Sequence, residues 1–126
     1  MIRACAVLLA AAVPAFAEDQ EVVIRVENGI VAEQGAVLRG LDRIRSTVTD
    51  FDIAPGQTIE YERLKVTLET CKYPEGKEQV EGFAYLTISD IRQDGTVFEG
   101  WMFASSPALS ALDHPRYDIW VLRCKT

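Results

Sequence analysis

The sequence predicts a mainly β domain: an antiparallel β-sandwich or small barrel with one short helix between the last two strands. Three observations lead to this prediction. Apolar and polar residues alternate over 64–70, Asp94-Gly95 is a strong β-hairpin signal, and strands do not alternate with helices anywhere along the chain. About seven strands and no parallel βαβ unit are therefore expected.

The first 17 residues are typical of a secretory signal peptide. Arg3 provides a basic start, an apolar run follows over 4–13, and Ala15-Phe16-Ala17 gives the small-residue pattern of a cleavage site. The apolar run is too short to span a bilayer. We therefore expect cleavage after Ala17 and export of the mature chain.

The alternative for this segment is a buried N-terminal helix. Four polar residues, Glu18 to Glu21, follow at once without a basic flank, so export is the better interpretation. Cys5 comes too early in the chain to carry a lipid after a complete apolar segment. No membrane anchor is therefore expected after signal cleavage.

The expected mature chain is a single domain, residues 18–126, of 126 − 17 = 109 residues. The formal charge of −6 becomes (13 − 1) − 19 = −7 when Arg3 is removed. An acidic chain without a cluster of lysines and arginines is repelled by polyphosphate, which argues against nucleic acid and anionic lipid as partners.

Two cysteines, Cys71 and Cys124, remain after the leader is removed. An even number in an oxidising compartment favours a disulfide, which would stabilise the fold by about 4 kcal/mol in the chain-entropy model. The alternatives are a zinc pair or a redox dithiol. Neither is supported, because the chain has no C-x-x-C motif and only one histidine, His114. No cofactor is expected.

The first half of the chain gives a mixed prediction. Residues 22–26 alternate as a strand before Asn28-Gly29. The segment 30–44 is expected to be irregular chain with one strand or turn, because Gly35 and Gly40 weaken a helix. The β-branched segment 46–53 predicts a strand. The Pro55-Gly56 pair that follows supplies the dihedral angles of a type II turn.

The second half gives clearer strands. Their expected ranges are 58–61, 64–71, 81–91, 96–103 and 117–124, with an exposed loop at 73–79. The strands at 81–91 and 117–124 are apolar on both faces, so both are expected to be central in a sheet.

The one short helix is expected between the last two strands. Ser105 or Ser106 can cap it and Pro107 suits its first position. Leu109 and Leu112 would then lie on a single face. The helix is expected to end before the His-Pro pair, because the residue before proline avoids helical geometry.

The same segment contains the residue types of a hydrolytic triad. Ser105 or Ser106 could be the nucleophile, His114 the base, and Asp113 or Asp118 the orienting carboxylate. No G-x-S-x-G motif is present, and helix capping with a turn explains the same residues. The structural interpretation is therefore favoured. A metal site at His114 and the two aspartates is disfavoured, because the intervening proline breaks any helix that would stack them.

Aromatic residues offer a second type of site. Trp101 and Phe103 share one face of their strand, Trp120 lies on the last strand, and Tyr117 begins it. If exposed, such rings would form a platform for a glycan or a protein partner. If buried, they form the core beside the disulfide, and this second interpretation is favoured.

Several motifs together resemble one known family. They are the run 100–107 (GWMFASSP), His114-Pro115, Tyr117-Asp118, the Trp120-Val121-Leu122 run before Cys124, and upstream the segment 38–42 (LRGLD). This pattern resembles DUF2155, a family of exported alphaproteobacterial proteins of unknown function. The usual lysine after Leu-Asp is Arg43 here. The resemblance implies export and pairing of Cys71 with Cys124, and it transfers no catalytic residue.

The functional hypothesis is a non-catalytic periplasmic binding or envelope-associated module whose ligand is an unknown envelope protein or glycan. Connections on a rigid sheet often carry function, so the surface is expected around the segment before the last strand. The alternatives are a serine hydrolase that acts on envelope material through Ser105 or Ser106 with His114, and a purely structural envelope protein. The candidate surface residues are Trp101, Ser105, Ser106, His114, Arg116, Tyr117 and Asp118.

Overall fold

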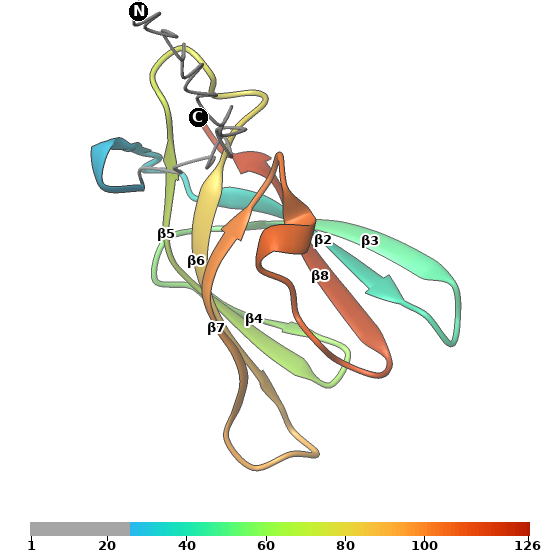
Figure 1. The fold of residues 1–126 in the computed structure, drawn as a ribbon. Helices are drawn as coiled ribbons and strands as arrows, with labels where there is room; N and C mark the ends of the chain where they lie inside the picture. Colours follow the sequence, from blue (N-terminus) through green and yellow to red (C-terminus); the bar gives the residue numbers. More distant parts are fainter. Residues whose placement is uncertain (1–25) are drawn as a thin grey trace, which may run out of the picture.

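The computed structural model describes residues 26–126, which form two antiparallel β-sheets packed face to face (Figure 1). The sheets remain separate, so the predicted β fold is confirmed and takes the form of a sandwich rather than a closed barrel. The first sheet contains β1 (Ile30–Val31), β4 (Thr58–Tyr61), β5 (Leu64–Tyr73), β6 (Phe83–Asp90) and β7 (Thr96–Phe103). The second contains β2 (Ala36–Asp42), β3 (Thr47–Ile53) and β8 (Tyr117–Cys124).

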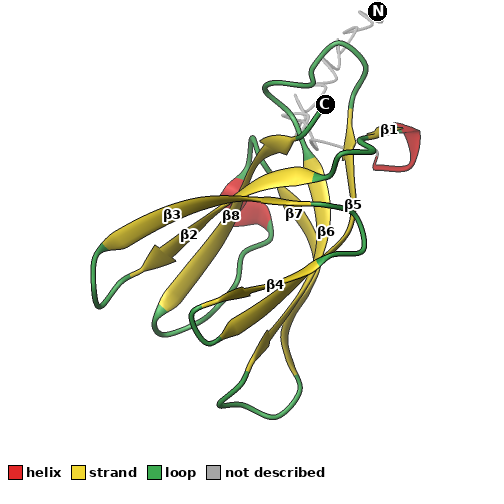
Figure 2. Ribbon diagram, turned by 180° about the vertical axis from the view of Figure 1, so that it is seen from behind, coloured by secondary structure: helices red, strands yellow, loops and turns green. Residues whose placement is uncertain are grey.

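In the five-stranded sheet the order is β1-β5-β6-β7, and β4 also pairs with β5. In the three-stranded sheet the order is β3-β2-β8, so β8 is an edge strand and the prediction that it is central was wrong. The β2–β3 hairpin extends beyond the other sheet in both views (Figures 1 and 2). This explains why β3 is exposed over most of its length.

The strands predicted at 46–53, 58–61, 64–71, 81–91, 96–103 and 117–124 are confirmed with small changes of bounds. The predicted turn is also confirmed. Gly56 has a φ of 79°, and the Gln57 N–H donates to the Ala54 carbonyl at 3.0 Å. The predicted leader (residues 1–17) and most of the strand at 22–26 lie outside the described residues. Within 26–126, no helix is long and apolar enough to cross a bilayer.

The segment 30–44, predicted to be irregular with one strand or turn, is more regular than expected, because it contains β1 and all of β2. Gly40 lies at the centre of β2, where the ring of Tyr61 packs directly against it. A Cβ atom at Gly40 would lie 2.7 Å from Tyr61 Cζ, closer than a real contact allows. The glycine therefore permits close approach of a ring to the strand.

The predicted helix was also wrong. The described chain has only two 3₁₀ turns, η1 (Val26–Asn28) and η2 (Pro107–Leu109). Ser106 occupies the position before η2 but makes no side-chain capping hydrogen bond in the described structure. Leu109 is 62% exposed whereas Leu112 is buried, so the two leucines do not share a packed face. Without a cap or an apolar face, a helix is not stabilised here.

The core lies between the two sheets. The five-stranded sheet contributes alternate residues of β5 and β6, and the three-stranded sheet contributes alternate residues of β2 and β8. The buried side chains at its centre are Leu38, Leu64, Val66, Leu68, Leu86, Ile88, Ile119 and Val121. Burying an aliphatic side chain of this size contributes roughly 1.5–3 kcal/mol, so these residues account for much of the stabilisation.

A β-bulge in β5 reverses the orientation of its last residues. Leu68 pairs with Leu86 and Thr70 pairs with Tyr85, which leaves Glu69 as an extra residue on β5. Strict alternation from Leu64 would turn Cys71 away from the core. The bulge turns it inward, and Cys71 is fully buried.

A second bulge does the same in β8. Val121 pairs with Leu38 and Arg123 pairs with Val37, so Leu122 is the extra residue. Cys124 is consequently buried on the same side as Val121. The predicted disulfide then forms between the two sheets: the Cys71 and Cys124 sulfur atoms are bonded, with Cα atoms 5.7 Å apart.

Candidate functional site

His114 lies buried at the end of the sandwich opposite the disulfide. Its Nε2 is 2.8 Å from Asp90 Oδ2, and its Nδ1 accepts hydrogen bonds from the backbone N–H groups of Arg116 and Tyr117 at 3.0 and 3.1 Å. Because Nδ1 accepts two donors, the ring proton belongs on Nε2 and points at the carboxylate. Both ring nitrogens are therefore used within the fold.

Asp90 is the fully buried partner of that imidazole. Burial raises the pKa of Asp90, but hydrogen bonds from the Arg92 backbone N–H and from His114 outweigh this effect and leave the pKa below its ordinary value. Arg63 lies 3.7 Å from the same carboxylate and adds a weaker attraction. The carboxylate is thus held ionised inside the protein.

A second buried carboxylate, Asp42, lies at the same end. Arg116 donates two hydrogen bonds to it, Nε to Oδ1 at 3.2 Å and Nη2 to Oδ2 at 3.1 Å, and the backbone N–H groups of Ile44 and Arg45 also donate to Oδ1. The bond from Arg116 lowers the pKa of Asp42, although burial opposes this effect. Every donor to Asp42 comes from its own turn or from Arg116.

Tyr117 fills the space between the His114–Asp90 hydrogen bond and the Asp42–Arg116 ion pair. The guanidinium groups of Arg63 and Arg116 lie 5.5 and 5.2 Å from its ring centroid, and the Tyr61 ring meets it edge-on at 5.8 Å. Arg63 and Tyr61 belong to the five-stranded sheet side, whereas Tyr117 begins β8. We call the group Asp42, Asp90, His114, Arg116 and Tyr117 the polar end, and it joins the two sheets.

The remaining polar candidates lie nearer the surface. Asp118 forms a two-point ion pair with Arg43, whose Nη1 also donates to the His114 carbonyl at 2.9 Å. Ser105 is exposed and Ser106 is half-buried, both at the start of the segment that leads to η2. Arg116 is half-buried and committed to Asp42.

These positions do not support a hydrolytic triad. A serine nucleophile needs an imidazole nitrogen free to take its proton, whereas Nε2 of His114 donates to Asp90 and Nδ1 is occupied by two backbone donors. The contact proposed for His114 and Tyr117 at the surface was also wrong, because both side chains are buried. Within residues 26–126, no three metal-ligating side chains are grouped to hold a metal ion.

Trp101 lies in a different setting, on the outer face of the five-stranded sheet. Its neighbour Met102 points into the core, so Trp101 and Phe103 point away from it. Strand register places Tyr85 beside Trp101 and Phe83 beside Phe103. The interpretation of Trp101 as core was therefore wrong, and its ring is partly exposed.

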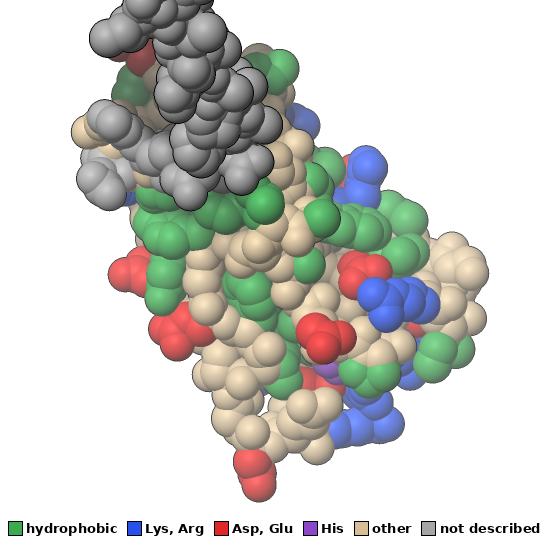
Figure 3. All heavy atoms as spheres, in the orientation of Figure 1, with side chains coloured by type: hydrophobic (Ala, Val, Ile, Leu, Met, Phe, Trp, Pro, Cys, Tyr) green, Lys and Arg blue, Asp and Glu red, His purple; other side chains and the backbone are tan. Residues whose placement is uncertain are grey.

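The four rings form two edge-to-face pairs. The centroids of Tyr85 and Trp101 are 5.4 Å apart at 81°, and those of Phe83 and Phe103 are 5.7 Å apart at 68°. Lys72 on β5 completes the group, with its ammonium 5.9 Å from the Trp101 centroid. We call these five residues the aromatic face. Figure 3 shows hydrophobic side chains gathered over the upper ends of β6 and β7.

Polar side chains adjoin the aromatic face in register. Thr70 lies beside Tyr85, and the next row along the strands contains Thr67, Thr87 and Glu99. Tyr85 Oη donates to Glu99 Oε1 at 3.4 Å, which links the rings to this polar row. Hydroxyl, carboxylate and ammonium groups therefore border the rings on a surface that is otherwise flat sheet.

Comparison with known proteins identifies the family. Residues 36–124 match the family described as "Uncharacterized protein conserved in bacteria (DUF2155)". The chain belongs to the DUF2155 family. An uncharacterized protein of Rickettsia prowazekii (strain Madrid E) is 29% identical over 87 residues, which cover 67% of this chain and 56% of that protein. The chain thus spans little more than half of this relative's length. No solved structure matches this chain.

The DUF2155 match covers both the polar end and the aromatic face. It begins at Ala36 on β2 and ends at Cys124, so it includes every residue of these two groups and both disulfide cysteines. Residues 1–35, which include the leader expected from the sequence, lie outside the match. The family assignment therefore rests on the sandwich itself.

The second tryptophan of this DUF2155 domain lies on the opposite side of the sandwich. Trp120 on β8 pairs with Arg39 on β2, on the outer face of the three-stranded sheet. Arg39 forms a two-point ion pair with Asp50, so this face is bordered by a salt bridge rather than by further rings. Trp120 is partly exposed but has no neighbouring aromatic block.

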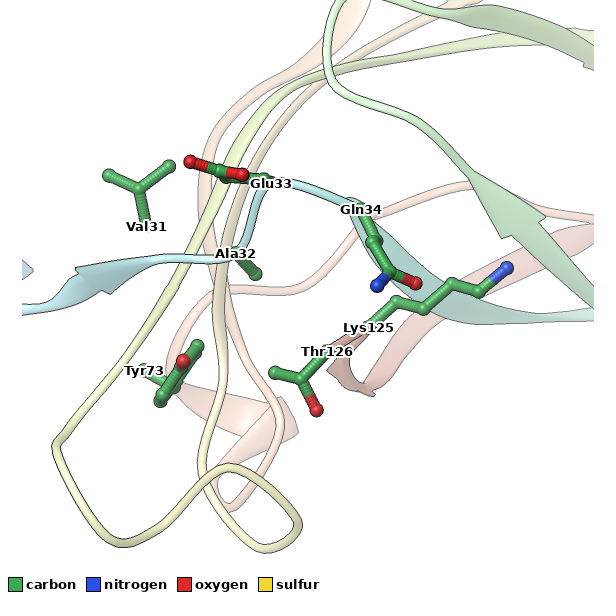
Figure 4. A pocket seen from close by; sticks show the side chains of 7 residues that line it. All are labelled: Val31, Ala32, Glu33, Gln34, Tyr73, Lys125 and Thr126. Carbon is green, nitrogen blue, oxygen red and sulfur yellow. The ribbon is translucent and has the colours of Figure 1, made fainter.

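A small pocket lies at the disulfide end of the domain (Figure 4). It has a volume of about 260 Å³ and is lined by Val31, Glu33, Tyr73 and Lys125 among others. The Lys125 ammonium is paired with Asp52 at 3.0 Å, and among the described lining residues the acidic side chain is Glu33. This set does not combine a nucleophile with a base.

Sequence reasoning missed part of both groups. Asp90 ends a predicted strand and Asp42 lies in the segment 30–44, and only their burial identifies them as structural ions. Tyr85 was missed because the segment 81–91 reads as apolar on both faces, and Lys72 because it lies just beyond the strand predicted at 64–71. The signal that could have found Tyr85 is its spacing of two from Phe83 on a strand whose partner carries Trp101 and Phe103 at the same spacing.

Proposed function

We propose that this protein is a non-catalytic binding domain of the bacterial cell envelope and that its contact surface is the aromatic face. The observation that carries the proposal is the outward position of Trp101 and Tyr85 on a sheet whose opposite face packs into the core. Partly exposed aromatic clusters of this kind are enriched at recognition surfaces because they bury much area with little loss of side-chain entropy.

The polar end supports a binding role rather than chemistry. Its imidazole, both carboxylates and Arg116 are bonded to one another or to the backbone. Groups that are fully engaged in the resting fold stabilise it and hold no free base for a substrate. The candidate surface therefore moves from the segment before β8 to the outer face of β5, β6 and β7.

The disulfide supports the envelope as the location. A bridge between Cys71 and Cys124 persists in oxidising compartments such as the periplasm and is rare in a reducing cytosol. Together with the leader expected at residues 1–17, this favours an exported domain.

The test compares two tryptophans that differ in the face they occupy. Purified protein is mixed with washed envelope fragments, and its co-sedimentation is measured for the wild type, Trp101→Ala and Trp120→Ala. We expect the wild type and Trp120→Ala to sediment with the fragments and Trp101→Ala to lose at least about tenfold in affinity, or about 1.4 kcal/mol. Equal loss in both variants, or no sedimentation of the wild type, would contradict the proposal.

A further inference from the structure

We propose that the ligand of the aromatic face is a glycan chain without net charge. This inference rests on the proposed function and adds the chemical class of the partner. It is argued from the arrangement of rings, hydroxyl groups and charges on the outer face of the five-stranded sheet.

The first step concerns shape. Trp101, Tyr85 and Phe103 are partly exposed and occupy adjacent outward positions on β6 and β7, with the buried ring of Phe83 packed beside Phe103. The exposed rings form a block about 5 Å across the strands and about 7 Å along them. The block lies on a sheet face rather than inside a closed pocket, which suits a section of a polymer better than an isolated small molecule. The C–H faces of sugar rings pack on such aromatic surfaces.

The second step concerns hydrogen bonding. Thr70 lies next to Tyr85, and Thr87 and Glu99 form the adjoining row, so hydroxyl and carboxylate groups border the rings directly. A saccharide presents apolar C–H faces with hydroxyl groups at their rim. The aromatic face therefore offers ring surface and rim partners in the arrangement that a sugar requires, whereas an aliphatic ligand would leave the rim groups unpaired.

The third step concerns charge complementarity. Lys72 is held over the Trp101 ring, and Glu99 accepts the Tyr85 hydroxyl, so one charge of each sign lies against the block. Glu69, the bulge residue of β5, adds a further exposed carboxylate nearby. With no cationic excess on this face and a formal charge of −6 on the chain, a polyanion is not attracted, and an uncharged chain is the matching ligand.

The experiment uses the protein as it is purified from cells that express the full chain, together with three defined probes. N-acetylglucosamine hexamer and maltohexaose are uncharged, and polygalacturonate is anionic. Binding is measured by titration calorimetry, and contacts are mapped by amide chemical shifts in the unmodified protein. We expect at least one uncharged probe to bind and to shift β5, β6 and β7 residues around Trp101, and polygalacturonate to bind at least about tenfold more weakly.

Variants sharpen the result. Trp101→Ala should lower the affinity at least about tenfold, Trp101→Phe should lose less because a ring remains, and Trp120→Ala should bind like the wild type. Circular dichroism checks that each variant is folded. Should Trp101→Ala fail to fold, the shift map of the wild type still decides the question.

Three outcomes would overturn the inference: no binding of either uncharged probe, stronger binding of polygalacturonate, or shifts confined to the Trp120 face. If envelope fragments still capture the protein in a Trp101-dependent way while both uncharged probes fail, the partner is a protein or lipid. In that case the proposed binding function is supported and the assignment of a glycan as the ligand is rejected.

Discussion

The two ends of the sandwich hold the same sheets together by different chemistry. At one end a covalent bond joins Cys71 on β5 to Cys124 on β8. At the other end, where β8 begins and β6 ends, the sheets are joined by the hydrogen bond between His114 and Asp90 and by the packing of Tyr117 against Tyr61. The ion pair between Asp42 and Arg116 lies beside these contacts. The disulfide tolerates acid but not reductant, whereas the polar end tolerates reductant but depends on the ionisation of Asp42 and Asp90.

The difference extends to backbone geometry. The disulfide end requires one bulge in each partner strand, at Glu69 and at Leu122, because regular alternation would turn both cysteines outward. At the polar end a register shift also occurs, between Ile88 and Ser89 where β6 pairs with β7, and Tyr61 packs there through the close approach that Gly40 allows. Local irregularities of the strands thus accompany the contacts between the sheets at both ends.

The largest effect is expected from deletion of Glu69. Removing the bulge residue moves Cys71 by one position and turns its side chain to the outer face, so the disulfide cannot form in the native register. We expect two free thiols in the protein isolated without reductant, detected by maleimide labelling, and loss of the disulfide's full stabilisation.

Deletion of Gln79 in the exposed loop between β5 and β6 is the matched control and should leave the bridge intact. An unreactive pair of cysteines after deletion of Glu69 would show that the bulge does not set their orientation.

The next effect is the loss of the bridge without a change of register. The double variant Cys71→Ser, Cys124→Ser should lower the free energy of unfolding by up to about 4 kcal/mol, because the bridge closes a loop of 53 residues in the unfolded chain. Urea unfolding measures the difference at neutral pH. Reductant should destabilise the wild type by a similar amount and leave the double variant unchanged, and any response of that variant to reductant would point to a different cause.

A smaller effect is expected at the polar end from Gly40→Ala. The added methyl group would lie within 3 Å of the Tyr61 ring, and overpacking of this kind typically costs about 1–3 kcal/mol. Tyr61→Leu removes the opposing ring, so the cost of Gly40→Ala should shrink in that background. A double-mutant cycle from urea unfolding measures the coupling, and additive effects would contradict the close contact.

These comparisons also show how far the sequence could be used. The strands β3 to β8 were predictable because their alternation and the Pro55-Gly56 and Asp94-Gly95 turns depend on neighbouring residues only. β2 was not predictable, because its glycines argue against a regular element. Gly40 is required there because the ring of Tyr61, twenty-one residues further along the chain, packs against it. The β-propensity of a residue reflects its local sequence and carries no information on such a tertiary contact.

The site was less predictable than the fold. The disulfide was predicted from the number of cysteines, although strict alternation in β5 contradicts it and only the bulges remove the contradiction. Spacing showed that Trp101 and Phe103 share a face, but not that Met102 would be the residue turned inward. His114 looked like a base for a serine because the sequence does not reveal that Asp90 and two backbone amides occupy its nitrogens.

The smallest effect under mild conditions is the response of the polar end to acid. The pKa values of Asp42 and Asp90 in the folded protein lie below the ordinary value of 3.8. A carboxyl group with a lowered folded-state pKa stabilises the fold above its unfolded pKa, and this contribution is lost as the pH falls toward the folded value. The free energy of unfolding should therefore be constant down to about pH 5 and fall at lower pH.

Urea unfolding of Asp42→Asn across the same pH range tests this directly, with Asp50→Asn as the control at an exposed ion pair. Asp42→Asn should be less stable than the wild type at neutral pH and lose less on acidification, because one of the two buried carboxyl groups no longer titrates. Asp50→Asn should change neither the stability at neutral pH nor the loss of stability on acidification by much, since the pair of Asp50 with Arg39 is screened by solvent. If the acid response of Asp42→Asn equals that of the wild type, Asp42 does not contribute to it, and the contrast between the two ends would rest on Asp90 and His114 alone.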